Sequence, residues 1–318
     1  MARSKIEWLG WPGTRPESWN PIKGCTRVSD GCEHCYALRE SHMRSFHPNP
    51  KIAEQFAGLT EKKNGRIDWT GEINVCMRLL DVPKRWRKPR TCFVCSMSDL
   101  FHARVPEALI GEIFHTMISA SDHRFLVLTK RPERMAAFLL TSPTWMKRPP
   151  KNVGLGISAS TQKTLDDRLS VLLGIPAAMH FVSIEPMLGE ISLSHHLWRR
   201  KDNWGNQHES GFKVMLDGRL DWVICGGESG AGARPTDPSW VRDLCLQCRD
   251  LVPFFFKQWG RYATAAQLPE DIFLEVARDT DAYPMIVREG AIHYDVGKKK
   301  SGHRLDGREW LQFPDMEV

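Results

Sequence analysis

The sequence predicts an α/β protein built on a partial or complete TIM-like (β/α) barrel of parallel strands, with surface insertions and a small C-terminal hairpin. Short apolar runs alternate along the chain with helical patterns, and this alternation is typical of parallel βα units. The 318 residues also suffice for a barrel of about 250 residues with insertions. A doubly wound open sheet has the same local pattern and is the alternative.

Seven short runs rich in apolar, β-branched and aromatic residues are predicted to be buried strands. They cover residues 72–77, 91–96, 124–129, 152–158, 179–184, 220–225 and 253–257. A first strand at residues 5–9 brings the predicted number to eight, which is enough for a complete barrel.

Four amphipathic helices are predicted between these strands. Pro106 and Pro132 each begin one, because proline is favoured in the first turn of a helix. Residues 161–173 form the third, and the fourth begins at Asp237 and continues to Cys248. Their apolar residues recur at helical spacing, so each helix has one face to bury.

The predicted barrel covers residues 1–268, with surface insertions near 46–69 and 194–218 that are polar and rich in turn-forming residues. Residues 269–318 are predicted to form a C-terminal extension packed on the barrel. Within it, residues 284–287 and 291–296 suggest a hairpin, followed by a basic loop at 298–304.

Composition excludes several classes of protein. Hydrophobic residues make up 42% and charged residues 26%, which is near the globular average and excludes a disordered or fibrous chain. No uncharged apolar stretch is long enough to span a membrane, and residues 1–10 lack the apolar core of a secretory signal. We therefore expect a cytoplasmic protein. The net charge of +6 mildly favours an anionic partner such as a nucleotide or nucleic acid.

The nine cysteines include one group with the spacing of metal ligands. An odd number of cysteines without a secretion signal favours free thiols or metal ligands over a disulfide scaffold. Cys25, Cys32 and Cys35 are separated by six and then two residues in a glycine-containing loop. Three thiolates suit zinc, with His34 or His42 as fourth ligand, or a [4Fe–4S] cluster with one open iron.

Polar residues follow the predicted strands, where parallel α/β folds bind their ligands. They are Ser96, Ser98, Asp99, Thr129, Lys130, Arg131, Ser158, Glu185, Glu228, Lys257, Gln258 and Trp259. Any one of them can be an ordinary turn or helix cap. Their recurrence at six strand ends favours a binding site on that rim.

Several motifs together resemble those of the radical S-adenosylmethionine (SAM) superfamily. They lie at residues 5–8, 19–21, 24–25, 31–32, 35–37, 96–102, 128–132, 226–230 and 305–310. The match is closest to a bacteriophage-encoded radical-SAM-like family that is similar in outline to spore photoproduct lyase. The resemblance implies a [4Fe–4S] cluster held by Cys25, Cys32 and Cys35, with SAM on the open iron. It also implies an external electron donor such as flavodoxin or ferredoxin, and the cytoplasm of a host cell if the gene belongs to a phage.

The chain departs from the superfamily at three points. The first gap between cysteines is six residues where three are usual, and His34 stands where an aromatic residue is usual. The sequence Gly226-Gly227-Glu228 follows a late strand, whereas the superfamily's Gly-Gly-Glu motif follows the second strand. The role of that motif in binding the SAM amino group is therefore not transferred to Glu228.

The candidate site residues divide into predicted SAM contacts and predicted substrate contacts. SAM carries an ammonium, a carboxylate and ribose hydroxyls, which need acceptors and donors. The predicted SAM contacts are His34, Tyr36, Ser96, Ser98, Asp99, Thr129, Lys130, Ser158 and Glu185. The predicted substrate contacts are Arg131, Glu228, Lys257, Gln258 and Trp259. The expected substrate is a nucleic-acid base or nucleotide, and no catalytic residue is assigned.

Alternatives remain at several positions. The chain could be a zinc-stabilised nucleic-acid-binding protein without redox chemistry, or a barrel hydrolase using Glu185 and Glu228 as paired carboxylates. Cys225, Cys245 and Cys248 could bind a second metal, although buried thiols acting as small apolar groups are more common. The basic residues 78–90, with Trp86 among them, could hold phosphates and stack a base, or form a solvated surface.

Overall fold

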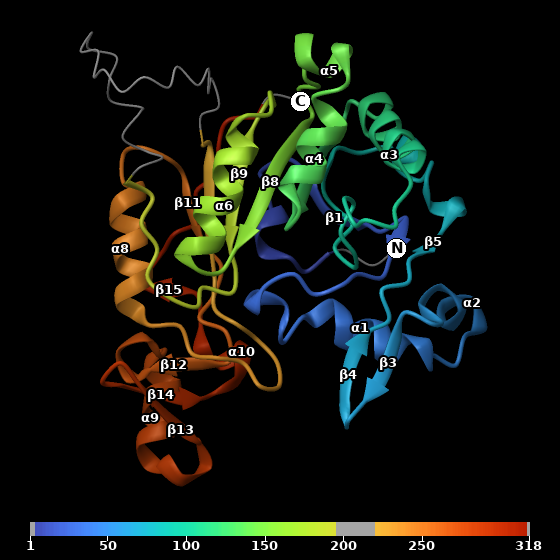
Figure 1. The fold of residues 1–318 in the computed structure, drawn as a ribbon. Helices are drawn as coiled ribbons and strands as arrows, with labels where there is room; N and C mark the ends of the chain where they lie inside the picture. Colours follow the sequence, from blue (N-terminus) through green and yellow to red (C-terminus); the bar gives the residue numbers. More distant parts are fainter. Residues whose placement is uncertain (1–3, 195–219, 317–318) are drawn as a thin grey trace, which may run out of the picture. The chain divides into compact units, whose positions relative to one another are not determined.

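The computed structural model describes residues 4–194 and 220–316 (Figure 1). The insertion predicted at 194–218 lies outside the described residues except for Ser194. The fold is mixed α/β and contains a seven-stranded parallel sheet with the order β1-β6-β7-β8-β9-β10-β11. The strands are β1 Arg15–Trp19, β6 Arg90–Val94, β7 Arg124–Thr129, β8 Val153–Ala159, β9 His180–Ile184, β10 Trp222–Cys225 and β11 Phe254–Phe256.

The chain divides into two compact units. Unit 1 comprises Met1–Ile157, Ile175–Met179 and Asp315–Val318, and unit 2 comprises Ser158–Gly174 and His180–Pro314. The predicted boundary at residue 268 stays a prediction.

Unit 1 contains β1, β6, β7 and most of β8, and its helices are amphipathic as predicted. α3 Glu107–Ser119 and α4 Pro132–Leu139 follow β6 and β7, and the short α5 Pro143–Lys147 precedes β8. Buried Ile110, Ile113 and Met117 lie on one face of α3.

The first strand is not where the sequence predicts it. Residues 5–9 form no strand; a 3₁₀ helix, η1 Glu7–Leu9, occupies them, and its buried Trp8 packs on Phe93 with ring centroids 5.0 Å apart. β1 begins only at Arg15, and it pairs in parallel with β6. Pro16 is tolerated there because β1 is the edge strand of this order.

The prediction of a barrel strand at residues 72–77 is also wrong. Only Asn74–Val75 forms a strand, β5, which pairs antiparallel with β2 Ile22–Lys23 in a separate two-stranded sheet. Met77 is largely exposed. The apolar residues of this segment therefore do not face a barrel core.

The predicted insertion at 46–69 has its own structure and core. It follows α1 Tyr36–Ser45 and includes α2 Pro50–Ala53, η3 Glu54–Phe56 and the hairpin β3 Thr60–Lys63 and β4 Arg66–Trp69. Phe56, Leu59 and Trp69 pack with Ala37 and Leu38 into a small cluster. Two 3₁₀ helices, η4 Met77–Leu79 and η5 Pro83–Arg85, lead from here to β6.

Unit 2 contains β9, β10 and β11, with β10 paired in parallel to both neighbours. Its main helices are α6 Gln162–Leu173 and α8 Pro238–Cys248, close to the predicted bounds. The predicted C-terminal hairpin is confirmed as β13 Met285–Arg288 and β14 Ala291–Asp295. β12 Tyr262–Thr264 adds a third strand to that sheet.

The remaining elements of unit 2 are short, apart from one further helix. They are η7 Ala265–Gln267, α9 Glu270–Arg278, η8 Thr280–Ala282, α10 Gly297–Ser301, β15 Arg304–Leu305 and β16 Arg308–Glu309. The prediction of a basic loop at 298–304 is thus partly wrong, because α10 contains its three lysines. Among the described residues, no helix is long and apolar enough to cross a membrane.

Candidate functional site

Three predicted metal ligands lie on one loop of unit 1, between β2 and α1. Cys25 follows β2, Cys32 ends the 3₁₀ helix η2 Asp30–Cys32, and Cys35 is the residue before α1. Cys32 is buried, Cys25 and Cys35 are half-buried, and all three are free thiols. The loop therefore presents three unpaired sulfurs within eleven residues.

Gly24 fixes the start of this loop. Its φ of +97° is in the left-handed region, and a Cβ atom there would overlap the carbonyl oxygen of Glu72. The Gly24 N–H donates to the carbonyl of Met97 (3.3 Å), just beyond the carboxyl end of β6. Cys25 is thereby held beside the polar residues that follow β6.

Asp99 is the centre of a polar cluster at the carboxyl ends of β6 and β7. Its Oδ1 accepts hydrogen bonds from Thr129 Oγ1 (2.7 Å) and the Phe101 N–H (2.9 Å). Its Oδ2 accepts from the Lys130 N–H (3.1 Å) and the Arg131 guanidinium (2.9 Å). Both carboxylate oxygens are thus occupied by the protein itself, so Asp99 organises its neighbours.

Arg131 joins this cluster to the cysteine loop. Besides Asp99, its guanidinium donates to the carbonyl and Oγ1 of Thr26 (3.1 and 2.8 Å) and to Cys25 Sγ (3.8 Å). These contacts bring Arg131, a predicted substrate contact, together with the predicted SAM contacts Asp99, Thr129 and Lys130. A permanent positive charge therefore lies beside one of the three sulfurs.

The other side of Thr26 contacts a buried histidine. His102 Nε2 lies 3.1 Å from Thr26 Oγ1. Burial lowers the pKa of His102 to about 4, and the positive charges of Arg131, Arg104 and Arg134 add to the decrease. The imidazole is therefore neutral at pH 7, and it can share a hydrogen bond with Thr26 in either direction.

The thiols of this loop differ in acidity. Burial raises the pKa of the Cys25 thiol to about 11, with Asp99 adding to the increase and Arg131 opposing it. Burial also opposes ionisation of Cys32, but the Lys130 ammonium and hydrogen bonds at Val28 and Ser29 lower the pKa of this thiol overall. Cys32 is therefore the thiol of this pair that ionises more readily.

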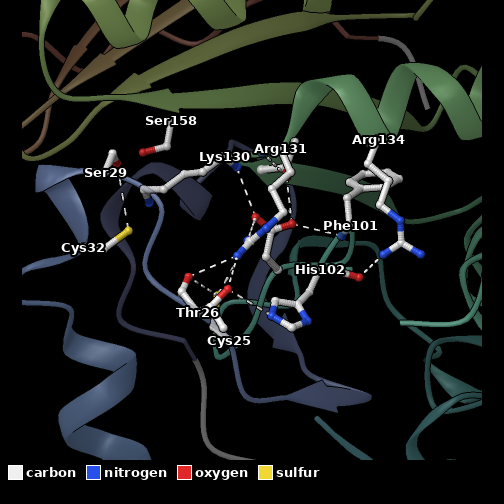
Figure 2. Close-up of polar contacts among 12 residues, drawn as sticks. Cys25, Thr26, Ser29, Cys32, Phe101, His102, Lys130, Arg131, Arg134 and Ser158 are labelled. Carbon is white, nitrogen blue, oxygen red and sulfur yellow. Dashed lines mark hydrogen bonds and ion pairs between the residues drawn. The ribbon is translucent and has the colours of Figure 1, made fainter. Parts of the chain in front are cut away.

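Lys130 is the least committed cation of the cluster. Figure 2 shows its side chain directed toward Cys32 and Ser29. Its backbone N–H is bonded to Asp99, but its ammonium has no hydrogen-bond or ion-pair partner among residues 4–194 and 220–316. An anionic group of a ligand could pair with it.

The remaining predicted SAM contacts of unit 1 support the backbone around the cluster. Ser98 Oγ donates to the carbonyl of Ile22 (3.0 Å), and Tyr36, half-exposed, donates to the carbonyl of Ser96 (2.6 Å). Ser96 Oγ is bonded to Asn20. His34 is half-buried on the cysteine loop.

The donor chemistry of the loop fits an iron–sulfur cluster or zinc, but the sulfurs are not gathered. Three thiols are the donors that a site-differentiated cluster requires. Within the described ranges, however, no three His, Cys, Asp or Glu side chains are close enough together to hold a metal ion. Cys25, Cys32 and Cys35 therefore fit such a metal group in donor type and number. Their sulfurs would have to move closer together to bind it.

The predicted residues of unit 2 form separate ion pairs at the ends of β9, β10 and β11. Glu185 pairs with Lys257 (2.6 Å). Glu228 Oε1 and Oε2 accept from the Arg234 guanidinium (2.7 and 2.8 Å), and Oε2 also accepts from the Arg234 N–H. Because each carboxylate has its own cation, this arrangement does not favour a paired-carboxylate hydrolase.

Three other predicted contacts in unit 2 are buried. Trp259 is 1% exposed, packs on Phe256 and donates its indole N–H to the carbonyl of Arg304 (2.9 Å). Gln258 donates to the carbonyl of Gly227 (2.9 Å), and Ser158 is buried near the end of β8. Trp259 thus serves as core in this structure.

Cys225, Cys245 and Cys248 behave as buried thiols. Burial raises the pKa of all three, that of Cys245 to about 11. Cys245 and Cys248 line a pocket of about 330 Å³ together with Arg249, Arg308 and Trp310. The residues that the structure describes include no group of three side chains positioned for a second metal.

Comparison with known proteins identifies the family but not the function. A family model described as a protein of unknown function (DUF5131) matches residues 3–314. The chain belongs to the DUF5131 family. No curated protein and no solved structure matches it.

Sequence reasoning missed three residues of the DUF5131 site. Asn20 accepts from the Met97 N–H (2.9 Å) because it directly follows β1, a strand the sequence did not predict. Thr26 and His102 lie in loops, where no periodic signal exists. His102 could have been found from its position three residues after Asp99, in the same strand-end loop.

Proposed function

We propose that this protein is a radical SAM enzyme that holds a [4Fe–4S] cluster and modifies or repairs a nucleic-acid base or nucleotide. The observation that carries the proposal is the position of three free thiols on one loop, directly beside a strand-end cluster with two cations. The resemblance of the sequence motifs supports the same chemistry. A partial TIM-like barrel is part of this proposal, supported by the seven-stranded parallel sheet and by the helices that follow β6, β7, β8 and β10.

Cys25, Cys32 and Cys35 would hold the cluster. The chemistry that a bound cluster supplies is one-electron reduction of SAM, which yields methionine and a 5′-deoxyadenosyl radical. The electron would come from an external donor such as flavodoxin or ferredoxin, in the cytoplasm. The protein's own task is to bind, orient and exclude water.

Residues of the Asp99 cluster are placed to contribute to that task. Asp99 positions Arg131, and Arg131 places a positive charge beside Cys25 that favours its thiolate. The Lys130 ammonium, which has no hydrogen-bond or ion-pair partner within residues 4–194 and 220–316, would pair with the carboxylate of SAM. Asp99 itself is saturated, so its role is positioning and not capture of the SAM ammonium.

The other predicted contacts keep their proposed roles. His34 and Tyr36 would contact the adenosyl group from the cysteine loop and α1, and Ser158 and Glu185 would take ribose hydroxyls. Glu228, Lys257 and Gln258 would face the substrate. In unit 2, the pairing of Glu185 with Lys257 means that a ligand must compete with an existing ion pair.

Anaerobic purification followed by iron, sulfide and zinc analysis tests the proposal. We expect about four irons per chain, and release of 5′-deoxyadenosine after reduction with SAM. Cys25→Ala, Cys32→Ala and Cys35→Ala should each lose iron and SAM cleavage. Cys245→Ala is the matched control and should keep both, because it is a buried thiol of unit 2.

Two outcomes would contradict the proposal. Full iron content in Cys32→Ala would remove the loop as cluster ligand. Stoichiometric zinc without iron, after an iron-replete anaerobic preparation, would support the alternative of a zinc-stabilised nucleic-acid-binding protein.

Lys130→Gln tests the proposed SAM contact separately. It should weaken SAM binding at least about tenfold, since a charge-assisted pair is lost, while iron content stays unchanged. Lys62→Gln, on the exposed β3–β4 hairpin, should change neither. Unchanged SAM affinity of Lys130→Gln would exclude this residue from the site.

A further inference from the structure

Residues 78–90, here called the basic strip, hold most of the chain's excess positive charge. The strip contains Arg78, Lys84, Arg85, Arg87, Lys88 and Arg90. Its only acidic residue is Asp81, while the whole chain has a net charge of +6. Neither the cluster chemistry nor the SAM contacts use any of these residues.

The strip follows the edge strand of unit 1 from one end to the other. Near its start, the Leu79 carbonyl accepts a hydrogen bond from the indole of Trp19, the last residue of β1 (2.7 Å). At its end, Arg90 is paired in register with Arg15, the first residue of β1. Because β1 has five residues, the strip extends along about 13 Å of strand.

An aromatic anchor holds the strip against the sheet. Trp86 is stacked on Phe125 (ring centroids 6.3 Å apart) and lies 5.2 Å from His123, and the Arg90 guanidinium lies 4.8 Å from its ring. This packing does not favour Trp86 as a platform for a stacked base, because protein groups already lie against the ring. The exposed charges of the strip are therefore the groups available to recognise a ligand.

Three neighbouring cations of the strip are exposed and have no ion-pair partner in the part of the chain that the structure describes. Lys84 pairs with Asp81, Arg90 pairs with buried Glu17, and Arg78 donates to the carbonyl of Lys51. Arg85, Arg87 and Lys88 are exposed, and in the described part of the chain no carboxylate forms an ion pair with them. Their charges are directed to solvent on a backbone fixed by Trp86.

We propose that the basic strip binds the phosphate backbone of nucleic acid through charge, without reading sequence. One strand of a duplex presents a phosphate every 3.4 Å of helix axis, so about four phosphates fall within the length of the strip. Arg85, Arg87 and Lys88 supply three cations to pair with them. Because Phe125, His123 and Arg90 pack on the half-buried Trp86 ring, backbone contacts are favoured over stacking of a base on this residue.

This inference goes beyond the proposed function, because binding at the strip needs no thiol, cluster or SAM. It gives the expected substrate class a second point of attachment in unit 1. If the substrate is a nucleic acid, loss of the strip should raise KM and leave kcat unchanged, because the strip touches no reacting atom.

Fluorescence anisotropy with a short labelled DNA duplex tests the inference, using the full chain at several salt concentrations. The triple variant Arg85→Gln, Arg87→Gln, Lys88→Gln removes three exposed cations. The slope of log K against log salt should become shallower by about 3, and affinity at low salt should fall more than about tenfold. The matched control Lys62→Gln, Lys63→Gln, Arg66→Gln removes three exposed cations from the β3–β4 hairpin and should change the slope little.

The outcomes separate this inference from the proposed chemistry. Equal losses from the two triple variants would overturn it, since only general charge would then matter. Unchanged DNA binding together with lost binding to vesicles of anionic lipid would also overturn it in favour of a membrane surface. Cys32→Ala should bind DNA like the unaltered protein, so failure of the cluster proposal leaves this test intact. A folded far-ultraviolet spectrum for both triple variants confirms that only charge was removed.

Discussion

Asp99 in unit 1 and Glu228 in unit 2 both follow a strand of the parallel sheet, and both are buried carboxylates in ion pairs with arginine. They differ in what they connect. The Asp99 carboxylate accepts hydrogen bonds from Phe101, Thr129, Lys130 and Arg131, which belong to two strand ends. Among the described residues, the hydrogen bonds to the Glu228 carboxylate come from Arg234, six residues away.

This difference separates a carboxylate that organises a site from one that closes its own loop. Through Arg131, Asp99 reaches Thr26 and Cys25 on a loop distant in sequence. Glu228 closes the turn that leads from β10 toward α8. We therefore expect a substitution of Asp99 to affect more of the molecule than a substitution of Glu228.

The largest effect is expected for Asp99→Ala. Removing one partner of a buried ion pair typically costs about 3–5 kcal/mol, because the other charge stays buried. Arg131 is 14% exposed as a side chain and cannot rehydrate easily. Glu228→Ala should cost about half as much, because Arg234 is 25% exposed. Urea unfolding measures both, and equal losses would contradict the distinction drawn here.

Two adjacent glycines, Gly226 and Gly227, test how tightly the turn beside Glu228 is packed. A Cβ atom at Gly227 would overlap the carbonyl of Trp259, whereas at Gly226 the nearest atoms, of Glu185 and Lys257, would be 3.4 Å away. Gly227→Ala should therefore destabilise the protein by about 1–3 kcal/mol or more, and Gly226→Ala by less. Thermal unfolding of the two variants is the measurement. A larger loss for Gly226→Ala would mean that the turn after β10 is packed differently.

Acid should weaken unit 1 through its buried histidines. Burial lowers the pKa of His102 to about 4 from an ordinary 6.5, and lowers that of His123 as well. The unfolded chain then binds protons at a higher pH than the folded chain, so stability falls as pH decreases from about 6.5 toward 4. His102 alone should account for about 2 kcal/mol between pH 7 and pH 5.

His102→Asn provides the control for this pH dependence, because asparagine does not titrate in that range. Its unfolding free energy should vary less between pH 7 and pH 5 than that of the unaltered protein. If the unfolding free energy of His102→Asn varies with pH as much as that of the unaltered protein, other groups cause the acid sensitivity. One of these is His293 in unit 2, because burial lowers its pKa as well.

The smallest expected effect is a difference in thiol reactivity between the two units. In metal-free protein, Cys32 has a lowered pKa, whereas the pKa of Cys245 is raised to about 11 by burial. The thiolate is the reactive form, so alkylation at neutral pH should label Cys32 at least about tenfold faster. Peptide mass spectrometry after timed iodoacetamide treatment measures the order. Faster labelling of Cys245 would contradict it.

The sequence predicted six of the seven sheet strands because a buried parallel strand is a nearly continuous apolar run. β1 could not be found this way. Its sequence, Arg-Pro-Glu-Ser-Trp, becomes a strand through pairing with β6 and an ion pair between Glu17 and Arg90, which only the fold brings together. Residues 72–77 have the opposite problem, since their β-like composition lies in a two-residue ladder at the surface.

The candidate site was predictable where it follows strands. Asp99, Thr129, Lys130 and Arg131 were expected on one rim because parallel strands end at the same edge, and the structure places them in contact. Arg234 was not expected, because its position depends on how a glycine-rich loop folds back on Glu228. The type and spacing of residues give little indication of a local turn geometry of this kind.

The edge of β11 has a consequence for the end of the chain. Leu311 forms a bridge with Phe255, the Phe256 N–H donates to the carbonyl of Trp310 (2.7 Å), and the Gln312 N–H donates to the carbonyl of Phe254 (3.2 Å). These three C-terminal residues therefore satisfy hydrogen-bonding groups that an open strand would offer to another molecule. A chain shortened before Trp310 would expose the three consecutive phenylalanines of β11 beside unpaired backbone groups. We expect such a chain to self-associate in solution before it loses activity.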